Sequence, residues 1–200
     1  MKDHSVHEIF PEYEEAKARS QLRLTEFLSA MPRDLDARDD MIAERLKRDN
    51  SSAKSKLGKI YALMSDLSHV VKPFIACSEG CSDCCKMNVS ISVIEAERLS
   101  AISRKPMAKV KHPERHPDDK FSGISCPFLV ENMCSVYEVR PYACRAHYSF
   151  DTNAYWCHPE RAHTGEMSLL LMGGARQAYD FVVINSSLRG FADIRDFFPE

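Results

Sequence analysis

Residues 77–85 have the sequence Cys77-Ser-Glu-Gly-Cys81-Ser-Asp-Cys84-Cys85, which places four thiols within nine positions. The other five residues offer almost no apolar surface, so this stretch gains little from packing, and its cysteines are expected to hold something. Thiolates at such spacings can converge on one soft metal ion or on a cluster. The stretch therefore predicts a metal-binding loop around which the rest of the chain is organised.

Further cysteines follow downstream, and seven in all are the candidate metal ligands: Cys77, Cys81, Cys84, Cys85, Cys126, Cys134 and Cys144. A structural zinc takes four ligands, so the surplus implies a second metal, a cluster, or thiols retained for redox chemistry. A [4Fe–4S] cluster also takes four cysteines, although C-x3-C-x2-C-C is not the bacterial ferredoxin run. Because Cys84 and Cys85 are adjacent, we expect only one of them to ligate a given metal. Cys157-His158 is a further candidate pair.

The composition argues for a cytosolic protein that keeps its cysteines reduced. Net charge is −2, from 27 basic and 29 acidic side chains, which gives no reason to expect nucleic acid or an anionic membrane as partner. No apolar run approaches the roughly 20 residues that span a bilayer, and the N-terminus lacks the apolar region of a signal peptide. A disulfide framework is the alternative use of eight cysteines. A bridge between the neighbours Cys84 and Cys85 would be strained.

Apolar periodicity predicts helices over residues 11–31, 34–48, 53–72, 92–103 and 165–187. The clearest buried face belongs to the third of these helices and comprises Leu57, Ile60, Tyr61, Met64, Leu67 and Val71. Ser92 and Glu95 form a capping box at the start of the fourth. Gly173-Gly174 falls inside the fifth, where it suggests a close helix contact or a kink.

The expected fold class is mainly α: a helical bundle-like domain with an irregular cysteine-rich metal-binding centre. Three regions are predicted to pack as one compact domain. Residues 1–72 form an N-terminal helical region, 73–163 the cysteine-cluster region, and 164–200 a C-terminal helix and tail. The apolar tail residues, among them Phe191, Ile194 and Phe197, are expected to dock as a short turn of helix.

The ordered motifs resemble the CxxCxxCC family, the YkgJ-like cysteine-cluster proteins described as zinc- or iron-chelating domains. The resemblance rests on the cluster at 77–85, the capped helix with Ser92 and Glu95, and the block Cys126-Pro-Phe-Leu, Cys134, Tyr137, Arg140-Pro141 and Cys144-Arg145. It implies that the seven cysteines together bind zinc or iron, with a [4Fe–4S] cluster as one form.

The resemblance also brings in a related class, the flagellin lysine-N-methylases, which carry a similar cysteine domain and use S-adenosylmethionine. Two functional hypotheses besides plain metal binding stay open. One is an enzyme, either an Fe–S oxidoreductase or a protein N-methylase acting on a protein partner. The other is a disulfide-stabilised interaction protein. The residues assign no catalytic group, since no Ser-His-Asp order, Walker loop or HExxH motif is present.

Overall fold

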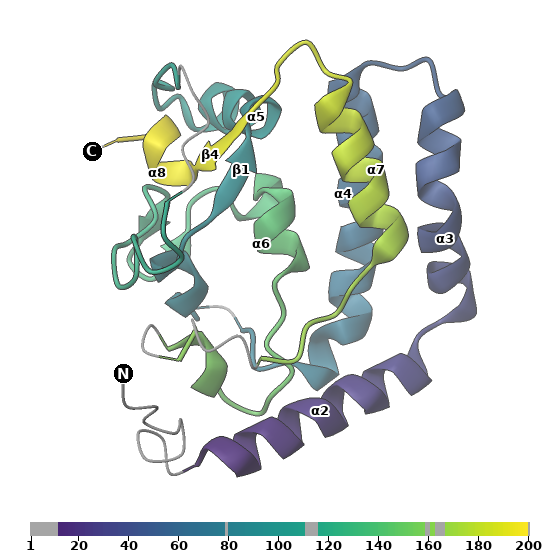
Figure 1. Ribbon diagram of the computed structural model, residues 1–200, viewed down its shortest axis with the longest axis vertical. Coiled ribbons are helices and arrows are strands. Elements are labelled where there is room, and N and C mark those ends of the chain that lie inside the picture. Colours follow the sequence, from purple (N-terminus) through teal and green to yellow (C-terminus); the bar gives the residue numbers. More distant parts are fainter. Residues whose placement is uncertain (1–11, 79, 111–115, 159–160, 163–166, 200) are drawn as a thin grey trace.

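A computed structural model describes residues 12–78, 80–110, 116–158, 161–162 and 167–199. Three helices lie side by side: α3 (Arg33–Arg48), α4 (Ala53–Val71) and α7 (Gly173–Ile184). A fourth helix, α2 (Tyr13–Ala30), runs across one end of this group (Figure 1). The mainly α fold class predicted from the periodicity is confirmed.

The other half of the molecule is built from short elements around the cysteines (Figure 1). Strand β1 (Ser90–Ser92) leads directly into α5 (Val93–Ser103) and pairs antiparallel with β4 (Phe191–Asp193), which leads into α8 (Ile194–Phe197). Strands β2 (Leu129–Val130) and β3 (Met133–Cys134) form a hairpin, followed by α6 (Tyr142–Ala146). Turns of 3-10 helix span Lys72–Phe74, Asp83–Lys86, Tyr137–Val139 and Tyr155–Cys157.

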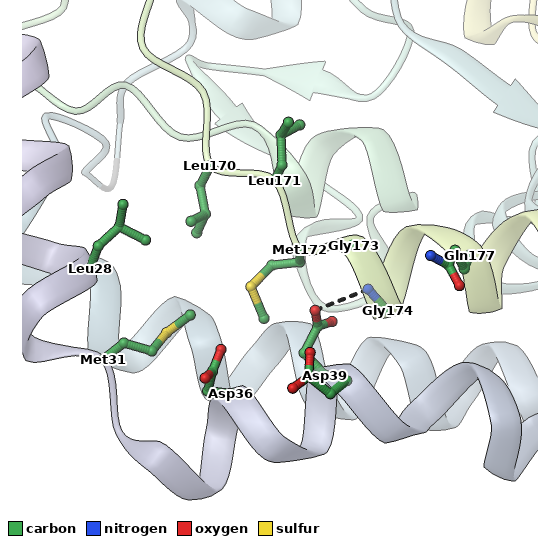
Figure 2. A pocket seen from close by; sticks show the side chains of 11 residues that line it. Leu28, Met31, Asp36, Asp39, Leu170, Leu171, Met172, Gly173, Gly174 and Gln177 are labelled. Carbon is green, nitrogen blue, oxygen red and sulfur yellow. Dashed lines mark hydrogen bonds between the residues drawn. The ribbon is translucent and has the colours of Figure 1, made fainter.

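The predicted start of the last helix is wrong. Its first two residues, 165–166, lie outside the described part of the chain, but Met172 is extended and α7 begins only at Gly173. The Asp39 carboxylate of α3 accepts hydrogen bonds from the amides of Gly174 at 3.0 Å and Ala175 at 2.7 Å, as Figure 2 shows for Gly174. These two amides would otherwise be unpaired at the helix start. The glycine pair therefore begins the helix and does not interrupt it.

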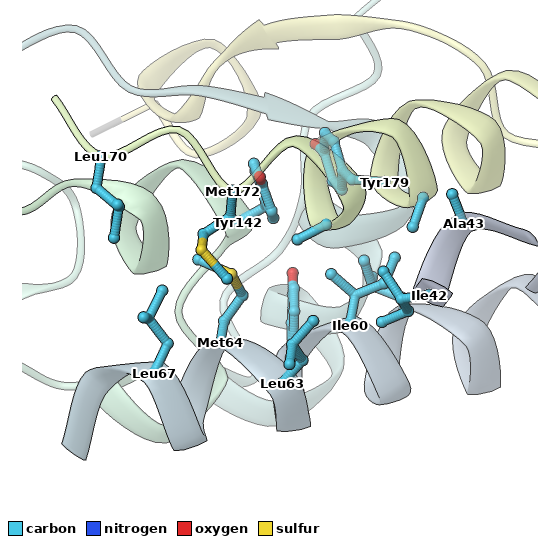
Figure 3. Packing of buried hydrophobic residues seen from close by; sticks show 14 of the residues in the cluster. Ile42, Ala43, Ile60, Leu63, Met64, Leu67, Tyr142, Leu170, Met172 and Tyr179 are labelled. Atoms are coloured by element: carbon cyan, nitrogen blue, oxygen red, sulfur yellow. The ribbon is translucent and has the colours of Figure 1, made fainter. Parts of the chain in front are cut away.

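A large apolar core fills the space between α3, α4 and α7 (Figure 3). All six residues of the face predicted for α4 are buried in it, together with Ile42 and Leu46 of α3 and Tyr179 of α7. Met64 of α4 points toward Met172, which lies above it in Figure 3. This packing supplies most of the stabilisation of such helices, because isolated helices of this length are marginal in water.

A second core lies beneath the cysteine region. Its buried members come from the β1–α5 segment, from the hairpin region and from the C-terminal segment 191–198: Val89, Ile91, Ala96, Leu99, Phe128, Val136, Ala192, Ile194, Phe197 and Phe198. The expected docking of the C-terminal tail is therefore confirmed, although the strand β4 within it was not predicted. Cys126, Cys134 and Cys144 pack against the margin of this core.

Candidate metal centre

All eight cysteines are free thiols, and most of them lie near the surface. The seven candidate ligands are partly exposed, whereas Cys157 is buried. Cys84 and Cys85 occupy the 3-10 turn Asp83–Lys86, Cys134 ends β3, and Cys144 lies in α6. The structure thus brings thiols from separate stretches of the chain into one region.

Four of these thiols form a mutually neighbouring set, here called the four-thiol group: Cys85, Cys126, Cys134 and Cys144. Each sulfur lies close enough to the other three for a negative charge on one to raise the pKa of the next. The backbone links them as well. The Cys126 amide donates to the Cys85 carbonyl at 2.7 Å, and Leu129, which pairs with Cys134 in the hairpin, donates to the Cys126 carbonyl at 2.9 Å.

The pKa values of the thiols in the four-thiol group are shifted in opposite directions by burial and by a neighbouring thiol. Burial raises the pKa of Cys126 to about 11 and raises those of Cys134 and Cys144. A hydrogen bond from the Cys84 thiol instead lowers the pKa of Cys85 to about 7, and the charges of Arg195, Lys86 and Arg140 act in the same direction. At neutral pH the group therefore holds one partly ionised thiol beside three protonated ones.

Cys77, Cys81 and Cys157 form a second set of interacting thiols. Cys157 interacts electrostatically with both Cys77 and Cys81, which also interact with each other. Cys84 neighbours Cys77 as well as Cys85 and Cys144, so it joins the two sets. We call Cys77, Cys81 and Cys157, together with the linking Cys84, the second thiol group. Burial raises the pKa of Cys157 to about 12.

Cys157 is the group member that the candidate ligand set left out. Its only sequence signal is its place in Trp156-Cys157-His158, because no CxxC spacing surrounds it. The side chain reaches the other thiols because the chain doubles back. Ala76 donates to the Ser149 carbonyl at 2.9 Å, and the 3-10 turn that ends at Cys157 follows a few residues later. Trp156, 1% exposed, anchors that turn.

Two arginines beside the thiols have different roles. The charge of Arg140 lowers the pKa values of thiols in both groups, including Cys77, Cys134 and Cys144. Arg145 is buried, and its guanidinium donates to the carbonyls of Arg140 at 2.9 Å and Glu138 at 2.5 Å. Arg140 thus offsets thiolate charge, whereas Arg145 holds the backbone that precedes α6.

Glu95 fixes the position of α6, the helix that carries Cys144. Its buried carboxylate accepts five hydrogen bonds: from the Tyr61 hydroxyl at 2.7 Å, the Tyr142 amide at 2.7 Å, the Tyr179 hydroxyl at 2.6 Å, and the Ser92 amide and hydroxyl at 2.9 and 2.8 Å. The capping box predicted for Ser92 and Glu95 is confirmed. The donors belong to α4, α6, α7 and the start of α5, so one carboxylate joins four elements. This role makes Glu95 structural.

The donor chemistry of the two thiol groups fits zinc or iron, both of which bind thiolate sulfur well. Among the described residues, no three His, Cys, Asp or Glu side chains already stand in the arrangement of a metal site. Also within the described part of the chain, none of the helices has the length and apolar character needed to cross a membrane.

Comparison with known proteins agrees with the cysteine pattern. Residues 76–160 match the model of the CxxCxxCC family, whose description is "Putative zinc- or iron-chelating domain". The resemblance expected from the motifs is therefore confirmed for this segment, which is similar to the family's domain. The match extends past Arg145 and includes Cys157 and His158. Comparisons with curated proteins and with solved structures gave no match.

Proposed function

We propose that this protein binds zinc or iron through thiolates, with Cys85, Cys126, Cys134 and Cys144 as the ligands of one centre. The observation that carries the proposal is that these four thiols, from three stretches of the chain, all interact electrostatically with one another, and that the Cys126 amide donates to the Cys85 carbonyl at 2.7 Å. Four thiolates are the ligand set of a structural zinc and equally of a [4Fe–4S] cluster.

The second thiol group, Cys77, Cys81, Cys84 and Cys157, is proposed as the site of a further metal. It accounts for the surplus of cysteines over the four that one centre needs. Its inclusion of Cys157 is supported by the electrostatic contact of that thiol with Cys77 and Cys81 and by the extent of the family match. Metal binding here would replace the protons that burial now holds on Cys77 and Cys157.

The test is the metal and acid-labile sulfide content of protein purified without oxygen. We expect about two metal equivalents in the wild type if both groups bind single ions. Cys144→Ser should lose the metal of the four-thiol group and keep the other, and Cys157→Ser should do the reverse. Iron with sulfide identifies a cluster, and zinc without sulfide identifies single ions. Wild-type metal content in Cys126→Ser and Cys144→Ser would contradict the ligand assignment.

An enzyme built on the same centre, an Fe–S oxidoreductase or a protein N-methylase, is the second candidate function. It is favoured by the partial exposure of the seven thiols, since a centre formed by them would lie within reach of a protein partner. This candidate predicts a visible spectrum that changes reversibly on reduction, or binding of S-adenosylmethionine measured by calorimetry. A colourless zinc protein that binds no S-adenosylmethionine would rule it out.

A further inference from the structure

Arg195 reaches the four-thiol group from outside the family segment. It lies in α8, in the C-terminal segment that pairs with β1 and packs into the second core. Its side chain is buried, at 9% exposure, and the guanidinium lies 4.9 Å from the centre of the Phe121 ring. A buried arginine must find partners for its donors and its charge.

The guanidinium of Arg195 has five N–H groups, and five acceptor atoms lie around it. They are, from Nε, Ser125 O at 3.3 Å; from Nη1, Met87 O at 3.1 Å and Asp193 Oδ1 at 3.0 Å; and from Nη2, Cys85 O at 3.1 Å and Ile124 O at 2.5 Å. Four of these acceptors are backbone carbonyls, two in the loop of Cys85 and two in the stretch just before Cys126. One side chain therefore binds both cysteine-bearing loops at the point where Cys126 donates to Cys85.

The position of Arg195 is itself fixed. Asp193 accepts from the Arg195 amide at 2.9 Å and from the Val89 amide at 2.6 Å, and Ile194 donates to the Val89 carbonyl at 2.9 Å. The guanidinium is thus held on the chain that follows Cys85, with its positive charge facing Cys85 and Cys126. A four-thiolate zinc centre carries excess negative charge, which a nearby cation stabilises.

We propose that Arg195 is a positioning residue for the metal centre: it sets the spacing of Cys85 and Cys126 and offsets the charge of the bound thiolates. This inference rests on the proposed function of the four-thiol group. Lysine cannot replace arginine here, because an ammonium has three donors and cannot span carbonyls of two loops as a planar guanidinium does.

The experiment uses Co²⁺ as the probe, because thiolate-to-cobalt absorption reports the sulfur ligands directly. Metal-free wild type, Arg195→Gln, Arg195→Lys and the control Arg189→Gln, an exposed position near the same chain end, are titrated with Co²⁺ against a competing chelator. Circular dichroism at low temperature establishes that each variant is folded. We expect Arg195→Gln to weaken Co²⁺ binding by about 10- to 100-fold, as loss of groups that orient ligands does. Its thiolate absorption should also be reduced, and Arg195→Lys should recover only part of both losses.

The outcomes separate this inference from the function on which it rests. A wild type that gives no thiolate–cobalt spectrum contradicts the proposed metal centre itself. A wild type that binds Co²⁺, beside a folded Arg195→Gln with the same affinity and spectrum, overturns only the role of Arg195. If Arg195→Gln does not fold, Arg195→Lys decides: wild-type affinity and spectrum in that variant would overturn the inference, and weaker binding by folded protein would support it.

Discussion

Gly174 shows how a single atom sets the distance between two helices. A Cβ at this position would lie 1.7 Å from the backbone carbonyl oxygen of Asp39, closer than any tolerated contact. The Asp39 side chain meanwhile binds the first amides of α7. The close approach of α3 and α7 therefore needs both a glycine at one residue and a carboxylate at the other. The neighbouring Gly173 meets no atom within 4 Å of a built Cβ and supplies a matched control.

We expect Gly174→Ala to lower the free energy of unfolding by about 3 kcal/mol, since the methyl group forces the helices apart and weakens the Asp39 cap. Gly173→Ala should change it by less than about 1 kcal/mol and can raise it, because alanine restricts the unfolded chain. Urea unfolding of the metal-free proteins measures both. Equal effects of the two substitutions would show that the close helix contact does not limit stability.

At the scale of elements, the Glu95 carboxylate joins α4, α5, α6 and α7. Its five donors leave no open acceptor direction on either oxygen. The pKa values of Tyr61 and Tyr179 are raised by burial and then by the Glu95 charge, so both hydroxyls stay protonated and donate. Since Tyr142 is two residues before Cys144, the hydrogen bonds to Glu95 also help to determine where one proposed ligand lies.

Glu95→Gln is expected to destabilise the protein by about 3 kcal/mol. The amide nitrogen of glutamine donates and cannot accept, so at least one buried donor loses its partner, and the remaining bonds lose their charge. The control is Glu97→Gln on the same helix, where the carboxylate pairs with Lys54 at 3.3 Å at the surface. A change below about 0.5 kcal/mol is expected there. A Glu95→Gln variant as stable as this control would contradict the stabilising role of the Glu95 carboxylate.

At the scale of the whole molecule, the two larger apolar cores differ in their relation to the cysteines. The core between α3, α4 and α7 contains none of the cysteines, whereas the second core borders Cys126, Cys134 and Cys144. The cysteine region is therefore the part of the molecule whose stability should depend on metal and on pH.

The metal-free and metal-loaded proteins should respond to pH in opposite directions. Burial raises the folded pKa of Cys126 to about 11 and of Cys157 to about 12, above the ordinary thiol value of about 8.5. Their contribution to stability is fully present below that ordinary value and is lost as the pH rises through the folded values. Metal instead binds the thiolate and releases its proton. Below the folded pKa of a ligand thiol, metal binding therefore becomes more favourable by about 1.4 kcal/mol per pH unit for each proton released.

Thermal unfolding with and without bound metal tests this expectation. The stabilisation by metal should grow between about pH 6.5 and 8.5. The metal-free protein should lose stability from about pH 8.5 upward, and Cys144→Ser should reduce that alkaline loss because the Cys144 pKa is also raised by burial. Stabilisation by metal that is constant with pH would exclude proton release from the proposed ligands.

Periodicity and spacing were enough to predict α2 to α5, the buried face of α4 and the capping box at Ser92, because each depends on residues at most a few turns apart. The helices predicted over residues 11–31 and 34–48 contain the apolar Leu28 and Met41, yet these side chains are 52% and 50% exposed. The same reasoning also extended the last helix through Leu171, which is 85% exposed. Apolar residues at a helical period are not all buried, since the neighbouring helices cover only part of each face.

The sequence by itself determined the helical character of the chain and its concentration of thiols in a region that matches a zinc- or iron-chelating family. Only the tertiary structure decided that Cys157 interacts with Cys77 and Cys81. It also decided that Arg195 in α8 binds both cysteine loops and that Asp39 caps a helix far along the chain. The physical reason is that these contacts join residues distant in sequence, whose meeting depends on packing that no local pattern encodes.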